Sequence, residues 1–297
     1  MKSIKVQAEN KINLVGKLLD ATFGDGKLSD GRHYERATVT VRVTQTYGGK
    51  TETSEIPVGM FATDFTSTGK PNPAMKSIHD LKLMNTAQNV GIDAAANVRF
   101  SGISLQENNF VSRTGQLING WQLRGSFVSE AKVSDVGSFA VEVFIMDMHD
   151  EVDSNGDPTG RLVLRGGIVQ YDGRLDVVNF IVEAPDAVEY ISQHWNTQDT
   201  VVVKGRIRVT SEEQEVASSG WGEEVPETTT RYVRELIVTT GLDPKEEDFA
   251  YDPTEIKKAF NERKAAIEQM QENARAHATK GTTANAPSTA ANKYSWE

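Results

Sequence analysis

The stretch YERATVTVRVT, residues 34–44, gives the clearest indication of the fold. Every second residue from 37 to 43 is apolar, namely Ala37, Val39, Val41 and Val43. The residues between them are polar, so the segment has one apolar face and one polar face. Such period-two alternation is typical of a β-strand that turns one face toward a core. The pair Gly48-Gly49 that follows indicates a tight hairpin into another strand over 51–61. A mainly β fold is therefore predicted.

The sequence around this stretch predicts five strands and one helix before residue 133. The strands are expected near residues 11–18, 34–44, 51–61, 98–105 and 116–128. The helix is expected over 74–84, where Met75, Ile78 and Leu81 recur at helical spacing. It falls between the third and fourth strands.

The next part of the chain repeats this order. Strands are expected over 139–148, 162–169, 175–182, 200–209 and 231–239, and a helix over 185–195. Five strands with a helix between the third and fourth is the order of the OB-fold, a small Greek-key barrel. The predicted fold is therefore mainly β, with two tandem OB-like five-stranded barrels, a C-terminal helix and a disordered tail. Another β-sandwich or barrel is the alternative.

Composition places the expected boundaries between these parts. The predicted units are a first barrel domain over 1–132, a second, acidic barrel domain over 133–245, a C-terminal helix over 246–275 and a disordered tail over 276–297. Asp252, Pro253 and Glu255 form a helix start, because Asp is a good N-cap and Pro is tolerated at the first helical position. The tail has almost no core-forming residues.

Charge is divided unevenly along the chain. The net charge of the 297 residues is −10. Residues 1–132 hold 16 basic and 12 acidic residues, whereas residues 133–245 hold 9 basic and 21 acidic residues. Residues 246–297 hold 7 and 9. Only the first part is therefore expected to attract nucleic acid over a distance, and the acidic second part is not expected to be the main site for a polyanion.

Several classes of function have no support in the sequence. There is no cysteine, which excludes disulfides, zinc-thiolate sites and cysteine nucleophiles. The acidic loop at Asp153 fails the EF-hand pattern, because Pro158 and Leu164 stand where glycine and glutamate are needed. No metal-binding histidine spacing, nucleotide-binding motif or hydrolase motif is present. No signal peptide or membrane span is recognisable. We expect a cytoplasmic protein without enzymatic activity, cofactor, metal or membrane partner.

The polar face of residues 34–44 is the predicted binding site. Binding of a single nucleic-acid strand needs cations along a groove and aromatic faces on which bases stack. The second and third strands of an OB barrel, with the adjoining loops, are the usual ligand surface. The predicted DNA-binding residues are Lys11, Lys17, Lys27, Arg32, Tyr34, Arg36, Arg42, Tyr47, Arg113, Trp121 and Arg124. The simpler alternative is that these cations only discourage edge pairing, and that Trp121 lies in the core.

Three segments resemble bacterial and phage single-stranded-DNA-binding proteins. These are NKINLVGKLLDATFG from residue 10, HYERATVTVRV from residue 33 and FVSRTGQLINGWQLRGSFV from residue 110, so the resemblance covers about residues 9–130. It implies a DNA-coating protein of replication or recombination, with Lys11, Tyr34 and Arg36 in the groove. The acidic second half departs from the simple bacterial pattern and resembles a phage variant, which places the protein in the host cytoplasm.

The resemblance also implies a tail whose acidic tip recruits replication or recombination proteins. Here the tip reads YSWE, with one acidic side chain. The predicted partner contacts are Trp221, in a glycine-flanked loop, and Tyr294 and Trp296 in the tail. A homo-oligomer is a further expectation. Two other functions remain open: an OB-fold interaction module of phage assembly or the replisome that does not bind DNA, and an RNA-binding protein.

Overall fold

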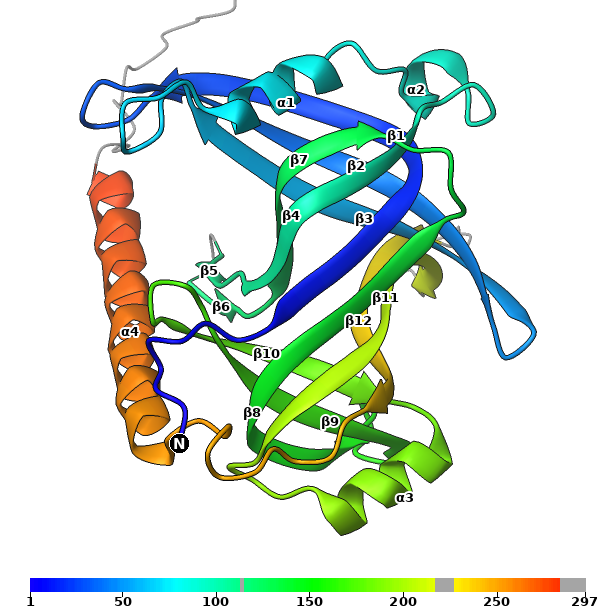
Figure 1. Ribbon diagram of the computed structural model, residues 1–297, viewed down its shortest axis with the longest axis vertical. Coiled ribbons are helices and arrows are strands. Elements are labelled where there is room, and N and C mark those ends of the chain that lie inside the picture. The colour runs from blue at the N-terminus through cyan, green and yellow to red at the C-terminus, as the bar shows by residue number, and fades with distance from the viewer. Residues whose placement is uncertain (113–114, 217–226, 284–297) are drawn as a thin grey trace, which may run out of the picture.

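The computed structural model describes residues 1–112, 115–216 and 227–283 of the chain. It contains two β-barrels, one above the other, with a long C-terminal helix alongside both (Figure 1). The mainly β architecture with two OB-like barrels and a C-terminal helix, predicted from the sequence, is confirmed. The predicted disordered tail lies outside the described residues from position 284 onward.

Five strands close the first barrel. They are β1 (Asn10–Lys27), β2 (His33–Tyr47), β3 (Lys50–Thr63), β4 (Asn97–Glu107) and β7 (Trp121–Glu130). Their order around the barrel is β1-β2-β3-β7-β4, and β4 pairs back with β1. All neighbours are antiparallel except β3 and β7. Helix α1 (Pro73–Leu81) and the short α2 (Ala87–Val90) lie between β3 and β4. This is the OB-fold order.

The second barrel has the same topology. Its strands are β8 (Val136–Val152), β9 (Pro158–Val169), β10 (Leu175–Val182), β11 (Thr200–Val216) and β12 (Glu227–Gly241). Their order is β8-β9-β10-β12-β11, and β11 pairs back with β8. The one parallel pair is β10 with β12, the counterpart of β3 with β7. Helix α3 (Pro185–His194) again lies between the third and fourth strands.

A single strand joins the two barrels. The first six residues of β1 pair with β8, from Asn10 opposite Val141 to Val15 opposite Val136. From Lys17 onward β1 pairs with β2 instead. Gly16 marks the change of partner: a Cβ atom there would lie 2.2 Å from the carbonyl oxygen of Arg42, so no other residue fits without moving the backbone. The ten strands therefore form one continuous sheet, and most of the buried apolar residues of both barrels form one continuous core.

Several element boundaries differ from those predicted. The strand expected over 116–128 is interrupted at Asn119-Gly120, which separates β6 (Leu117–Ile118) from β7. Together with β5 (Phe110–Val111), β6 forms a small separate hairpin. The polar segment 149–160, expected to be a loop, is mostly strand, because β8 and β9 pair across it as far as Val152 and Pro158.

The C-terminal helix α4 (Pro253–Thr283) begins where the sequence predicts. The side chain of Asp252 accepts a hydrogen bond from the backbone N–H of Thr254 at 2.8 Å, as an N-cap does. The helix continues eight residues beyond the expected end at 275. Alanine has the highest helix propensity and recurs in this region, and the first proline comes at Pro287. None of the described helices has the length and apolar content needed to cross a membrane.

A buried carboxylate ties the N-terminus to the second barrel. The side chain of Glu142 on β8 is only 3% exposed. It accepts hydrogen bonds from the ammonium groups of Lys2, at 2.9 Å, and Lys245, at 3.0 Å, and from the backbone N–H of Glu9. Burial raises the pKa of this carboxyl, but the two ammonium groups and the N–H together lower it below its usual value.

This pKa shift predicts a pH-dependent contribution to stability. A lowered folded-state pKa stabilises the fold above the unfolded pKa, about 4.3, and this contribution is lost as the pH falls through the folded pKa. Glu142→Gln is therefore expected to reduce the free energy of unfolding by about 3 kcal/mol at pH 7, because it leaves two ammonium groups without their carboxylate. Urea unfolding at pH 7 and pH 3 measures the difference, which should shrink at pH 3. Equal midpoints at pH 7 would contradict this role.

Candidate nucleic-acid interface

The outer face of the first barrel carries the predicted polar residues of β2. The apolar residues of the strand are at most 2% exposed and lie in the core, as the alternation predicts: Ala37, Val39, Val41 and Val43. Tyr34, Arg36 and Arg42 lie on the opposite, outward face with threonines between them. The strands β1 and β3 flank β2 on either side.

Two aromatic rings lie next to each other on this outer face. The ring centroids of Tyr34 and Phe61 are 5.1 Å apart, with 31° between the ring planes. Phe61 is 47% exposed, although it is a large apolar residue. The ring of Tyr34 lies across Gly26 of β1, where a Cβ atom would come within 2.8 Å of the tyrosine hydroxyl oxygen. The glycine therefore leaves the space in which the ring lies flat against the neighbouring strand.

Two arginines flank these rings, and each also lies across a glycine. A Cβ atom at Gly24 of β1 would be 3.0 Å from Nε of Arg36, and one at Gly59 of β3 would be 3.3 Å from Nη1 of Arg124. No carboxylate of the described residues forms an ion pair with Arg36 or Arg124. Their charges are therefore available to an anion outside the protein. Arg36 is directly opposite Phe61 in the strand register.

These four residues define what we call the β2–β3 face: Tyr34, Arg36, Phe61 and Arg124. It is an open, cationic and aromatic surface on the outside of a barrel. Phe61 was not among the predicted site residues. The alternation of β3 contains the signal for it, because Ile56, Val58 and Met60 lie in the core and Phe61 follows on the polar face.

Other predicted residues of the first barrel have partners within the protein. The ammonium group of Lys17 donates to the carbonyl oxygens of Asp93 and Ala95, at 3.3 and 2.9 Å. Arg42 forms an ion pair of 2.7 Å with Glu55 on the adjacent strand. The charges of these two side chains are less available than those of Arg36 and Arg124.

Tyr47 lies between the two barrels. The guanidinium carbon of Arg206, from the second barrel, is 4.5 Å from its ring centroid, and its hydroxyl donates to Gln45 at 2.6 Å. Arg206 therefore already occupies one face of this ring. The sequence analysis placed Tyr47 in the groove. It could not foresee the contact with Arg206, because that residue is 159 positions further along the chain.

Three predicted cations lie at the margins. Lys11 is on the part of β1 that pairs with β8, is 76% exposed and forms an ion pair with Glu9. Lys27 is exposed at the end of β1. Arg32 is in the turn after it, where the carboxylate of Asp30 raises the arginine pKa. Of these three cations only Lys27 has no ion-pair partner among the described residues, and it lies on the β1–β2 hairpin beyond Tyr34.

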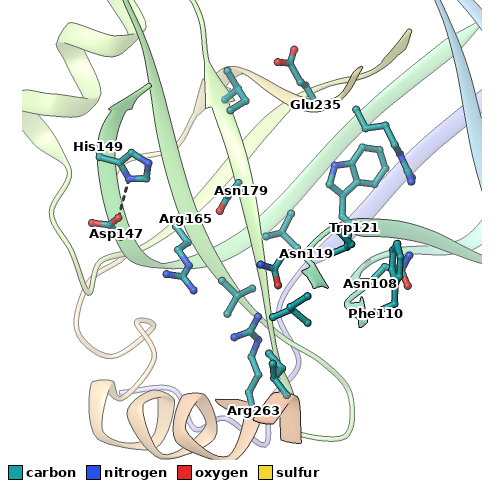
Figure 2. A pocket seen from close by; sticks show the side chains of 18 residues that line it. Asn108, Phe110, Asn119, Trp121, Asp147, His149, Arg165, Asn179, Glu235 and Arg263 are labelled. Atoms are coloured by element: carbon teal, nitrogen blue, oxygen red, sulfur yellow. Dashed lines mark hydrogen bonds and ion pairs between the residues drawn. The ribbon is translucent and has the colours of Figure 1, made fainter. Parts of the chain in front are cut away.

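Trp121 is separated from the β2–β3 face. It is 7% exposed, and the guanidinium carbon of Arg234 lies 4.6 Å from its ring centroid. Trp121 therefore lies in the core, which is the alternative given in the sequence analysis, and not in an exposed groove. It lines a cavity of about 890 Å³ between the two barrels, shown in Figure 2. The other predicted site residues, Arg113, Trp221, Tyr294 and Trp296, lie outside the described residues.

Two closed barrels with the strand order of the OB-fold, one of them bearing a cationic and aromatic outer face, define a tandem OB-fold protein. The chain belongs to the YorF family, whose model matches residues 8–273. No curated protein matches the sequence.

Two similar solved structures are forms of the single-stranded DNA binding protein from Thermus aquaticus. The wild-type form has a TM-score of 0.51 and 10% sequence identity, over 81% of this chain and 95% of that one. A deletion mutant has a TM-score of 0.51 and 13% identity, over 81% of this chain and 97% of that one. At this level of identity the likeness concerns the fold.

Proposed function

We propose that this protein binds single-stranded DNA without sequence preference, through the β2–β3 face. The observation that carries the proposal is the pair of neighbouring rings, Tyr34 and Phe61, flanked by two arginines without ion-pair partners among the described residues. The rings offer stacking platforms for successive bases, and Arg36 and Arg124 offer charges for the phosphates. Every base has a π-face, so this arrangement does not depend on sequence.

The comparisons support the proposal at the level of the fold. The similar Thermus aquaticus protein is named for binding single-stranded DNA, and it shares the arrangement of this chain over most of its own length. In an OB barrel the second and third strands form the usual surface for oligonucleotides. The β2–β3 face is therefore at the position where this fold most often binds a strand.

The finer parts of the function are proposals as well. We infer a DNA-coating role in replication or recombination, in a protein of bacteriophage origin that acts in the host cytoplasm. Partner binding through Trp221, Tyr294 and Trp296, a homo-oligomer, and domain boundaries at 132 and 245 stay predictions.

Titration of the full chain with a fluorescent dT oligomer at several salt concentrations tests the proposed function. We expect tight binding at low salt, and an affinity that falls steeply as salt rises, because each neutralised phosphate of a single strand contributes about −0.7 to the slope of log K against log salt. A matched RNA oligomer is the control for the RNA-binding alternative. Failure to bind dT at low salt would contradict the proposal and favour an interaction module.

A further inference from the structure

The cavity between the barrels contains two arginines that no carboxylate of the described residues neutralises. We call it the interbarrel cavity; its walls are the β5–β6 hairpin and the start of β7, the outer surface of β8, β9, β10 and β12, and α4. Arg165 on β9 and Arg234 on β12 both line it. Neither forms an ion pair with a carboxylate of the described residues. This is unexpected in the half of the chain that holds 21 acidic and 9 basic residues.

Aromatic rings hold both arginines in place. The guanidinium carbon of Arg234 lies 4.6 Å from the ring centroid of Trp121, and that of Arg165 lies 6.0 Å from the ring centroid of Phe260 on α4. An aromatic ring leaves the positive charge of an arginine uncompensated, whereas a carboxylate partner compensates it. The cavity walls lower the pKa of Arg234 by removing water, although its side chain is still open to solvent.

The acidic groups in the walls already have hydrogen-bond partners within the protein. Glu235 accepts hydrogen bonds from Arg161, at 2.6 Å, and Arg208, at 3.0 Å. Asp147 is within 2.9 Å of Nδ1 of His149. The third arginine of the wall, Arg263, is likewise paired with Glu107. The two unpaired arginines, Arg165 and Arg234, therefore outnumber Asp147, the one described carboxylate of the lining whose partner is not an arginine, and the cavity is positive overall.

The remaining walls suit the other parts of a nucleotide. Figure 2 shows Arg165 and Trp121 on opposite sides of the cavity, with Asn119 and Asn179 between them in this view. Amide side chains donate and accept hydrogen bonds, as the edge of a base requires. Phe110 of the β5–β6 hairpin is 50% exposed and lines the same cavity. A volume of about 890 Å³ is within the range of small-molecule sites.

The cavity also lies at an equivalent place in the duplicated fold. By strand order β9 and β10 correspond to β2 and β3, so Arg165 and Asn179 are on the counterpart of the β2–β3 face. In the first barrel this face is open. In the second barrel the β5–β6 hairpin and α4 cover it and leave the cavity beneath them.

We propose that the interbarrel cavity binds a short phosphate-bearing segment of a single strand, with Arg165 and Arg234, on opposite sides of the cavity, each holding a phosphate, and the amides and Phe110 contacting the base. This site would be a second one beside the β2–β3 face. It rests on the proposed function in one respect: the nucleotide is taken to belong to a bound single strand. A strand bound to the first barrel would then continue into the second.

Three probes on the full chain test this proposal: a 15-residue dT oligomer, dTMP and inorganic phosphate. Arg165→Gln combined with Arg234→Gln is expected to weaken binding of the dT oligomer about tenfold and to abolish any binding of dTMP. Arg165→Gln alone leaves the Trp121–Arg234 contact in place and should show part of the loss. It serves as the test if the double variant does not fold. Arg174→Gln, in the exposed turn between β9 and β10, removes one positive charge and is the matched control for Arg165→Gln. Urea unfolding checks that each variant is folded.

The outcomes separate this proposal from the proposed function. Loss of affinity in the cavity variants, with Arg174→Gln unchanged, supports the interbarrel site. Equal binding of the dT oligomer and dTMP by the cavity variants and the intact chain overturns it. Binding of inorganic phosphate alone, without dTMP or the oligomer, also overturns it as a nucleotide site. If the intact chain binds dTMP through these arginines but not the oligomer, the cavity stands and the proposed function fails.

Discussion

Replacement of both exposed rings, Tyr34→Ala with Phe61→Ala, is expected to weaken binding of a dT oligomer at least about 30-fold. Stacking of a base on an aromatic side chain contributes about 1–3 kcal/mol, so the loss of two platforms costs about 2 kcal/mol or more. Fluorescence anisotropy of a labelled oligomer at low salt measures the effect. The rings are 5.1 Å apart and share one surface, so the two single variants need not be additive.

Two control variants make this prediction specific. Tyr34→Phe removes the hydroxyl but keeps the ring, and it should retain most of the affinity. Tyr171→Ala removes a ring that is 77% exposed in a turn of the second barrel, and it should have no effect. A loss below about threefold in the double variant, with the fold intact by circular dichroism, would mean that the rings are not stacking platforms.

Replacement of both flanking arginines, Arg36→Ala with Arg124→Ala, is expected to reduce affinity at least about 100-fold at low salt. A charge-assisted hydrogen bond contributes about 1.5–3 kcal/mol, and two such contacts would be lost. The salt dependence changes as well. The slope of log K against log salt should become shallower by about 1.4, which is 0.7 for each phosphate contact. The intact chain and the variant should therefore converge as salt rises.

Arg42→Ala is the matched control for this pair. Arg42 is on the same face of the same strand, but Glu55 already neutralises its charge at 2.7 Å. We expect a change of less than about threefold and a nearly unchanged salt slope. If Arg42→Ala matched the effect of the double variant, net charge alone would explain binding, and the distinction between paired and unpaired arginines would be wrong.

The fold could be predicted because its signals are local. Alternation in residues 34–44, the glycine pair after it and a helix between the third and fourth strands of each half can all be read within short windows. The joining of the barrels could not be predicted in this way. The pairing of Asn10–Val15 with Val136–Val141 depends on register between segments 126 positions apart, and neither segment encodes its partner.

The site was predictable only in part, for the same reason. Tyr34 and Arg36 were predicted from residue type and strand face, and Arg124 from its place near Trp121 in the sequence; Phe61 follows from the alternation of β3. Lys17, Arg42 and Tyr47 each contact a residue of another strand or loop. These contacts cannot be read from the sequence, so it could not separate available side chains from those with partners.

The interbarrel cavity was beyond sequence reasoning altogether. Its two free arginines come from β9 and β12, and the rings that hold them come from β7 and α4. The acidic net charge of residues 133–245 predicted that no phosphate would bind in that part of the chain. Net charge sums over a whole surface, whereas a ligand responds to the few charges that line its cavity.

Photocrosslinking tests the central account most directly. A dT oligomer carrying 5-iodouracil, bound to the full chain and irradiated, attaches to aromatic side chains against which its bases stack, and mass spectrometry of the peptides locates the attachment. We predict crosslinks at Tyr34 and Phe61 that disappear when unlabelled dT competes. Efficient crosslinks that map only to other parts of the chain, with both of these residues unmodified, would contradict the assignment of the β2–β3 face.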